Sequence, residues 1–136
     1  MIHYVLILAA GKGLRLKNQK NRKQFLELAN LPIVMHSAIV FRQADPDSDI
    51  YIALPKGFKP KWEKLCKKYN FTINHKIYIG GQTRFSTVSK GLNKIHKDIL
   101  EKKRIQKHPS ELNNNTNNPL VSIHDAARPF INKEFI

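Results

Sequence analysis

The stretch that decides the fold is YVLILAAGKGLR, residues 4–15. It opens with an uninterrupted apolar run from Tyr4 to Leu8, which is typical of a parallel strand covered on both faces. Gly11 and Gly13 follow and end the strand in a loop. Glycine lets the backbone approach a ligand and turn its N–H groups toward phosphate oxygens. The stretch therefore predicts a strand that runs into a phosphate-binding loop.

The rest of the chain alternates strands with helices. Further strands are predicted at residues 50–54, 76–79 and 120–123, and helices at residues 32–41, 59–69 and 85–99. Pro32 is expected at the first position of its helix, and the asparagine-rich stretch 113–118 is expected to be a surface loop. Repeated βαβ units predict an α/β fold with an open, mostly parallel sheet, helices on both faces and ligands at the carboxyl ends of the strands.

Composition excludes several classes of protein. The chain has 136 residues, a length that predicts one domain spanning residues 1–136, and its single cysteine excludes an internal disulfide. Its first apolar run, at residues 4–10, is far shorter than the ~20 residues that span a bilayer. It also lacks the flanks of a signal peptide. We therefore expect a cytoplasmic protein with no membrane partner.

The chain is strongly basic, with 24 Lys+Arg against 10 Asp+Glu and a formal net charge of +14. Such a charge raises nucleic acid as a candidate partner. The lysines are spread along the chain and accompany many Asn and Ile residues, a bias typical of AT-rich genomes. No aromatic RNA-binding motif, helix-turn-helix or zinc finger supports a nucleic-acid partner. The same positive field would also favour an anionic small molecule.

The first loop fits neither common nucleotide-binding motif. A dinucleotide fingerprint needs glycine where the chain has Leu16, and a P-loop needs a Gly-Lys-Ser/Thr ending that the loop lacks. What remains is a GxGxR loop with a cluster of cations, namely Lys12, Arg15, Lys20, Arg22 and Lys23. Arginine and lysine are the residues that bind phosphate. The simpler alternative is a tight turn with exposed basic residues.

Two other loops also follow predicted strands. GGQTR, residues 80–84, follows the third strand, and the simpler interpretation is a helix start capped by Thr83. His124 and Asp125 follow the fourth strand. A carboxylate there suits Mg²⁺ beside a polyphosphate, and the simpler interpretation is a pair between Asp125 and Arg128. Because all three loops leave carboxyl ends of strands, we expect them to share one site.

Four segments together resemble the 2-C-methyl-D-erythritol 4-phosphate cytidylyltransferases of the nonmevalonate isoprenoid pathway. These segments are AAGKGLRL (9–16), RKQFLELANLPIVMHS (22–37), GGQTRFSTVSKGL (80–92) and HDAARPFI (124–131). The resemblance implies a three-layer, Rossmann-like sheet of the nucleotidyltransferase type. It also implies transfer of CMP from CTP to an alditol phosphate, 2-C-methyl-D-erythritol 4-phosphate, with release of pyrophosphate.

The resemblance assigns roles by position in the matching motifs. Stabilisation of the transition state is assigned to Arg15 and Lys23. The triphosphate is assigned to Lys12 and the loop amides around Gly11 and Gly13. The residues expected around the cytosine are Ala9, Ala10, Gly81, Gln82 and Thr87, with Arg84 as support. Asp125 is expected to bind Mg²⁺. Thr87 stands where the family usually has serine and keeps the hydroxyl group.

The family continues well past the HDAARP segment, so the resemblance implies that this chain is an N-terminal portion, with a sheet incomplete at its C-terminus. We expect little or no transferase activity from it alone, and a homodimer for the full-length enzyme. Alternatives are ribitol-5-phosphate cytidylyltransferase, another sugar-phosphate nucleotidyltransferase that uses UTP or GTP, and a CTP-binding module without catalysis.

Overall fold

The computed structural model describes residues 2–11, 23–105 and 118–126. Its strands are β1 (His3–Leu8), β2 (Glu27–Leu28), β3 (Leu31–Pro32), β4 (Asp49–Leu54), β5 (Lys76–Ile79) and β6 (Leu120–Asp125). Its helices are the short 3-10 helix η1 (Lys23–Phe25) and the α-helices α1 (Ile33–Ala44), α2 (Lys59–Lys68) and α3 (Arg84–Ile105). Every predicted strand and helix is therefore present.

Four strands form one sheet in the order β5-β4-β1-β6, and every pairing in it is parallel. Strand β1 lies in its interior, where Leu8 is in register with both Ala53 and Asp125. Val5, Leu6 and Ile7 are fully buried, as expected for a parallel strand covered on both faces. The prediction of an α/β fold with a parallel sheet is confirmed.

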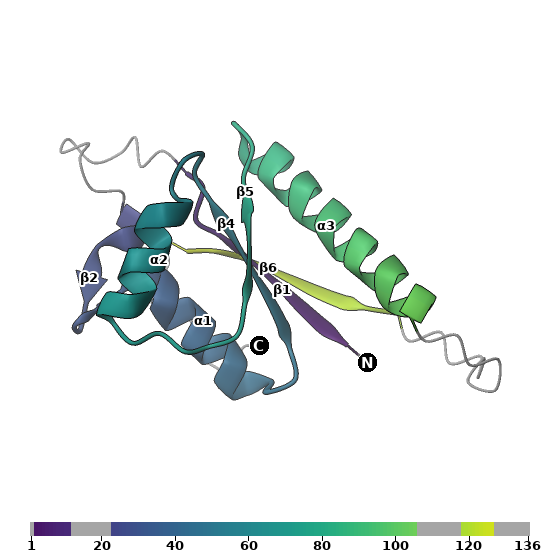
Figure 1. Cartoon of the computed structure of the whole chain (residues 1–136), viewed down its shortest axis with the longest axis horizontal. Helices are drawn as coiled ribbons and strands as arrows, with labels where there is room; N and C mark the ends of the chain where they lie inside the picture. The colour runs from purple at the N-terminus through teal and green to yellow at the C-terminus, as the bar shows by residue number, and fades with distance from the viewer. Residues whose placement is uncertain (1, 12–22, 106–117, 127–136) are drawn as a thin grey trace.

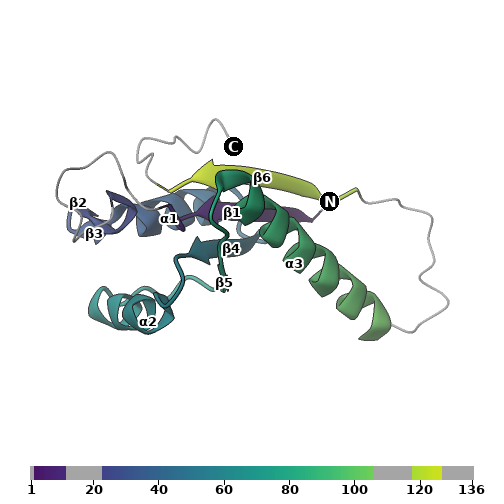
Figure 2. The same ribbon diagram turned by 90° about the horizontal axis from the view of Figure 1, so that it is seen from above.

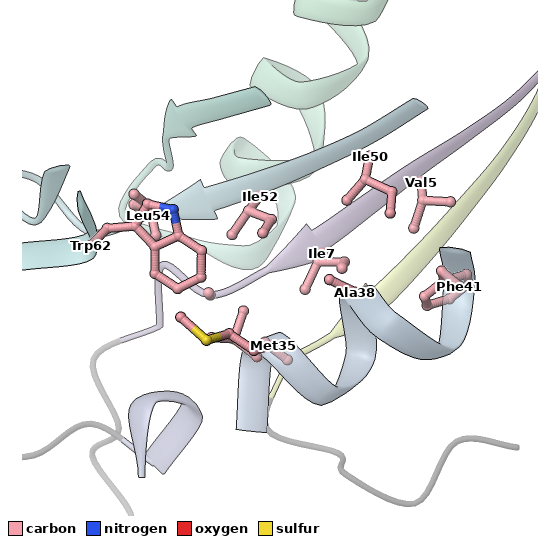
Figure 3. Packing of buried hydrophobic residues seen from close by; sticks show 12 residues of the cluster. Val5, Ile7, Met35, Ala38, Phe41, Ile50, Ile52, Leu54 and Trp62 are labelled. Carbon is pink, nitrogen blue, oxygen red and sulfur yellow. The ribbon is translucent and has the colours of Figure 1, made fainter. Parts of the chain in front are cut away.

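Helices cover both faces of the sheet, with α1 and α2 on one side and α3 on the other (Figures 1 and 2). Alternate side chains of each strand point to opposite faces, so the chain has two buried clusters. The larger cluster packs Val5, Ile7, Ile50 and Ile52 against α1 and Trp62 of α2 (Figure 3). The smaller cluster packs Tyr4, Leu6 and Tyr51 against Ile95 of α3.

Three details differ from the sequence-based expectation. A small antiparallel hairpin, β2 and β3, lies before α1, and its turn residues Ala29 and Asn30 have positive φ angles of 51° and 67°. Pro32 occupies the N-cap position of α1 rather than the first helical position, because it also pairs in the hairpin. Strand β6 continues through Asp125. The stretch expected to be an asparagine-rich loop lies outside the described residues, except for Asn118.

Candidate functional site

The three loops singled out in the sequence leave the same edge of the sheet. Three backbone hydrogen bonds extend the parallel pairing one residue past the strands, from the N–H groups of Ala9, Gly80 and Ala126, at 2.9, 2.9 and 3.0 Å. Their acceptors are the carbonyl oxygens of residues in the neighbouring strands. The loops after β1, β5 and β6 therefore begin side by side, at the edge where ligands bind in parallel α/β sheets.

The loop after β5 contacts the loop after β1 directly. A Cβ atom added to Gly80 would lie 2.3 Å from the Cβ of Ala10, so only glycine allows this approach. The neighbouring Gly81 donates its N–H to Thr87 Oγ1 at 3.0 Å, and the hydroxyl of Thr87 donates to the carbonyl of Thr83 at 3.0 Å. Because Thr87 is only 4% exposed, its hydroxyl group acts inside the loop and fixes the Gly81 backbone.

Tyr78 of β5 also binds Thr87. Its hydroxyl donates to the carbonyl oxygen of Thr87 at 3.0 Å. Burial raises the pKa of Tyr78 to about 12, so the phenol stays protonated and remains a donor at neutral pH. The first turn of α3 is thereby fixed to the sheet at the edge where the loops meet.

The start of α3 is capped reciprocally. Ser86 N–H donates to Thr83 Oγ1 at 3.0 Å, and Thr83 N–H donates to Ser86 Oγ at 3.1 Å. Serine here takes the place of the Glu or Gln usual in a capping box. The interpretation of Thr83 as a helix cap is confirmed.

Arg84, the first residue of α3, pairs with Asp125, the last residue of β6, beside the second and third loops. The Nε–H group of Arg84 donates to Asp125 Oδ1 at 3.2 Å, and the two side chains are 63% and 33% exposed. An ion pair this open contributes little to stability, about 0–1 kcal/mol, so its placement at the loop edge matters more than its energy. The alternative partner of Asp125, Arg128, lies outside the described residues.

His124, next to Asp125 in the motif, belongs to the opposite face of the sheet. Its Nε2 lies 3.2 Å from Ser37 Oγ of α1, and its ring meets that of Phe41 edge-on at 5.6 Å. Consecutive strand residues point to opposite faces, so the histidine fixes β6 to α1 while the aspartate faces α3. The two residues of the motif therefore contact different helices, His124 contacting α1 and Asp125 contacting α3.

The sequence does not predict a role for Gln24. This side chain is 4% exposed, and its Nε2 donates to the carbonyl oxygens of Ala9 at 3.0 Å and Gly11 at 2.9 Å. It is part of the RKQF segment, but nothing in that segment shows that the amide reaches the first loop. Only the folded chain brings these residues together.

Other site predictions lie outside what the structure describes. These are Lys12, Gly13 and Arg15. For Lys23 the structure describes the backbone, at the start of η1, but not the side chain. The predicted residues that the structure brings to one edge are Ala9, Ala10, Gly11, Gly81, Gln82, Arg84, Thr87 and Asp125. Buried Ala9 contributes backbone only, and Gln82 is exposed.

Among the described residues, no group of three or more His, Cys, Asp or Glu side chains could hold a metal ion by itself. Mg²⁺ is usually held by one or two carboxylates together with substrate phosphates. Asp125, partly exposed at the loop edge, fits that mode. Within the same described part of the chain, no helix is long and apolar enough to cross a membrane.

A parallel α/β sheet whose interior strand β1 runs into a loop, with two more loops at the same edge, defines a Rossmann-like α/β protein. Comparison with known families makes this specific, because the family model for 2-C-methyl-D-erythritol 4-phosphate cytidylyltransferase matches residues 3–105. The chain belongs to this family.

Individual relatives agree with the family. The chain is 37% identical over 133 residues to the 2-C-methyl-D-erythritol 4-phosphate cytidylyltransferase of Azobacteroides pseudotrichonymphae and 35% identical over 133 residues to that of Porphyromonas gingivalis, covering 98% of this chain and 50% of each relative. The crystal structure of 4-diphosphocytidyl-2C-methyl-D-erythritol synthase from Anaerococcus prevotii has the same fold, with a TM-score of 0.61 at 18% identity, over 98% of this chain and 46% of that one. The chain thus spans about half the length of the curated relatives it matches.

Proposed function

We propose that this chain carries the CTP-binding part of an enzyme that transfers CMP from CTP to 2-C-methyl-D-erythritol 4-phosphate and releases pyrophosphate. The observation that supports this most is the shared edge, where the loops after β1, β5 and β6 meet. Ala10, Gly80 and Thr87 hold two of those loops in direct contact. The family match supports the choice of a cytidine nucleotide and of 2-C-methyl-D-erythritol 4-phosphate as the acceptor.

The proposed chemistry needs positioning and charge neutralisation more than acid–base catalysis. An oxygen of the acceptor phosphate attacks the α-phosphorus of CTP, and the bond to the pyrophosphate oxygen breaks. We assign stabilisation of the negative charge that develops in this step to Arg15 and Lys23. Lys12 and the loop amides at Gly11 and Gly13 are assigned to the β- and γ-phosphates.

The cytosine is assigned to the space bordered by the loops after β1 and β5. Ala10 and Gln82 supply mainly backbone groups there, which suits recognition of a base edge, while Ala9, whose N–H and carbonyl are bonded to Ala53 and Gln24, and Gly81 form its border. The N–H of Gly81 is already bonded to Thr87 Oγ1, so we assign Thr87 the role of fixing the shape of this pocket. Arg84 supports the same loop.

Asp125 is the residue that we assign to Mg²⁺. Bound there, the ion would neutralise phosphate charge and orient the triphosphate. Asp125 Oδ1 accepts a hydrogen bond from Arg84, so the cation is expected to meet a carboxylate whose orientation is already set. A homodimer and a cytoplasmic location also belong to the proposal, and both rest on the family.

Calorimetric titration of the purified chain with CTP, and with UTP in parallel, tests the proposal in the presence of Mg²⁺. We expect binding of CTP and clearly weaker binding of UTP. A chain that circular dichroism shows to be folded, but that binds neither nucleotide, would refute it. Equal binding of both would leave a nucleotidyltransferase site and remove the assignment to cytidine.

A further inference from the structure

We propose that Gln24 is a positioning residue that couples the first loop to the segment carrying Lys23; this inference rests on the proposed function. The two N–H groups of one side-chain amide bind two carbonyl oxygens of the loop, those of Ala9 at 3.0 Å and Gly11 at 2.9 Å. The reverse orientation would place the amide oxygen against two other oxygens. Chemistry therefore fixes which side of the amide faces the loop.

The two bonds determine which way the loop presents its backbone. A carbonyl oxygen directed at a triphosphate would repel it, whereas an N–H group would bind it. In a planar trans peptide the C=O and N–H groups point in opposite directions. With the carbonyl oxygens of Ala9 and Gly11 both bonded to Gln24, the N–H group of Ala10, which shares a peptide plane with the Ala9 carbonyl, is directed away from Gln24. The amide thus keeps two carbonyl oxygens of the loop turned toward Gln24 and away from a bound phosphate.

The backbone of Gln24 is itself held firmly. It lies in η1, where the ring of the next residue, Phe25, stacks on Phe58 with centroids 4.2 Å apart and meets Trp62 edge-on at 6.3 Å. The carbonyl oxygen of Leu26 accepts a hydrogen bond of 3.0 Å from the first residue of α1. The η1 segment is therefore anchored to both helices on its face of the sheet.

This anchoring makes Gln24 a link between two parts of the phosphate site. On one side it holds the loop after β1, and on the other it is adjacent to Lys23, which begins η1. Loss of the two hydrogen bonds from the Gln24 side chain would leave both the loop after β1 and the η1 segment folded. It would remove the fixed spacing between them. The expected result is weaker binding of CTP without global unfolding.

Two variants of Gln24 test this, with one matched control. Gln24→Met keeps the length of the side chain and removes both donors, while Gln24→Glu places a carboxylate against two carbonyl oxygens. Gln43→Glu makes the same chemical change at an exposed position of α1. We expect both Gln24 variants to bind CTP at least about tenfold more weakly than the wild type, and the control to bind normally.

A pH series distinguishes positioning from a general loss of packing. Burial raises the pKa of a carboxyl group, and the protonated form regains one donor. The CTP affinity of Gln24→Glu, relative to Gln43→Glu, should therefore recover between about pH 8 and about pH 6, whereas Gln24→Met should not recover. Gln24 variants that are folded by circular dichroism and bind CTP like the wild type would overturn the inference.

A measurement on the wild type covers the case in which the Gln24 variants fail to fold. The ¹⁵N resonance of the Gln24 side-chain amide should shift when CTP and Mg²⁺ are added. Its two N–H hydrogens should also exchange with solvent more slowly. Unchanged resonances in a wild-type chain that binds CTP would also overturn the inference. If the folded wild type does not bind CTP at all, the proposed function itself fails, and calorimetry shows this before any variant is made.

Discussion

Replacement of Gly80 by alanine should disrupt the contact on which the proposed pocket depends. The added Cβ would lie 2.3 Å from Ala10 Cβ, 3.0 Å from Thr87 Oγ1 and 3.1 Å from Thr87 Cγ2. Ordinary contacts between carbon atoms are about 3.5–4.0 Å, so Ala10 and position 80 must separate by more than an ångström. Neither neighbour can turn aside, because Ala10 Cβ is attached directly to the backbone and Thr87 is buried.

The size of the effect follows from the absence of a flexible neighbour. Overpacking of this kind typically costs about 1–3 kcal/mol, which for a chain of this length lowers the melting temperature by roughly 3–10 °C. The shift must also strain the bond between Gly81 N–H and Thr87 Oγ1. We therefore expect weaker binding of CTP as well as lower stability.

Gly11→Ala is the matched control. A Cβ atom there meets nothing within 4 Å, so the substitution should be neutral or slightly stabilising through the unfolded state, by at most about 1 kcal/mol. Thermal unfolding followed by circular dichroism should separate the two variants, and Gly11→Ala serves as a control for stability only. Equal melting temperatures for Gly80→Ala and Gly11→Ala would refute the reasoning, because they would show that the two loops can move apart freely.

Three further predictions concern single groups. Burial lowers the pKa of His75, so the unfolded chain binds the proton more readily than the folded chain. The free energy of unfolding should therefore fall as the pH drops below about 6.5. Unfolding can be followed by the fluorescence of Trp62, whose Nε1 donates to His75 at 3.1 Å. His75→Gln should flatten that dependence; an unchanged slope would contradict the assignment. Thr87→Val should weaken CTP binding about tenfold and Thr87→Ser should preserve it, because only serine keeps an acceptor for Gly81 N–H. Calorimetry measures the two affinities, and equal values would contradict the positioning role of Thr87. Asp125→Asn should abolish the gain in CTP affinity on addition of Mg²⁺ and leave the metal-free affinity nearly unchanged; a retained gain would place the metal elsewhere.

The sheet could be predicted from sequence because buried parallel strands have a strong local signal. Tyr4 to Leu8 and Ile50 to Leu54 are apolar runs that end at glycine or proline, and the structure places both runs in the sheet interior. The hairpin of β2 and β3 was missed because two-residue strands have no periodicity to detect. Its turn uses Ala29 and Asn30 at positive φ, and alanine gives no warning of that conformation.

The site was predicted only in part, because sequence patterns are local whereas the contacts of the site join distant segments. That three loops share an edge follows from parallel topology, which the sequence indicates. Which side chains then bond to one another depends on contacts across 41 positions for Arg84 with Asp125, and across 15 and 13 for Gln24 with the first loop. No local pattern contains this information. Asp125 therefore stays a predicted site residue, and its ion pair with Arg84 is a contact that only the folded chain reveals.

The contacts that the described residues make around the proposed nucleotide pocket lie between residues 9 and 126. Gln24 orients the loop after β1, and Thr87 and Gly80 fix the loop after β5 against it. Arg84 then joins that loop to Asp125. Since these contacts form between residues of this chain, its affinity for CTP tests the pocket separately from any test of transfer to an acceptor. Binding with the expected sensitivity to Gly80→Ala and Gln24→Met would establish that the nucleotide half of the reaction is built here.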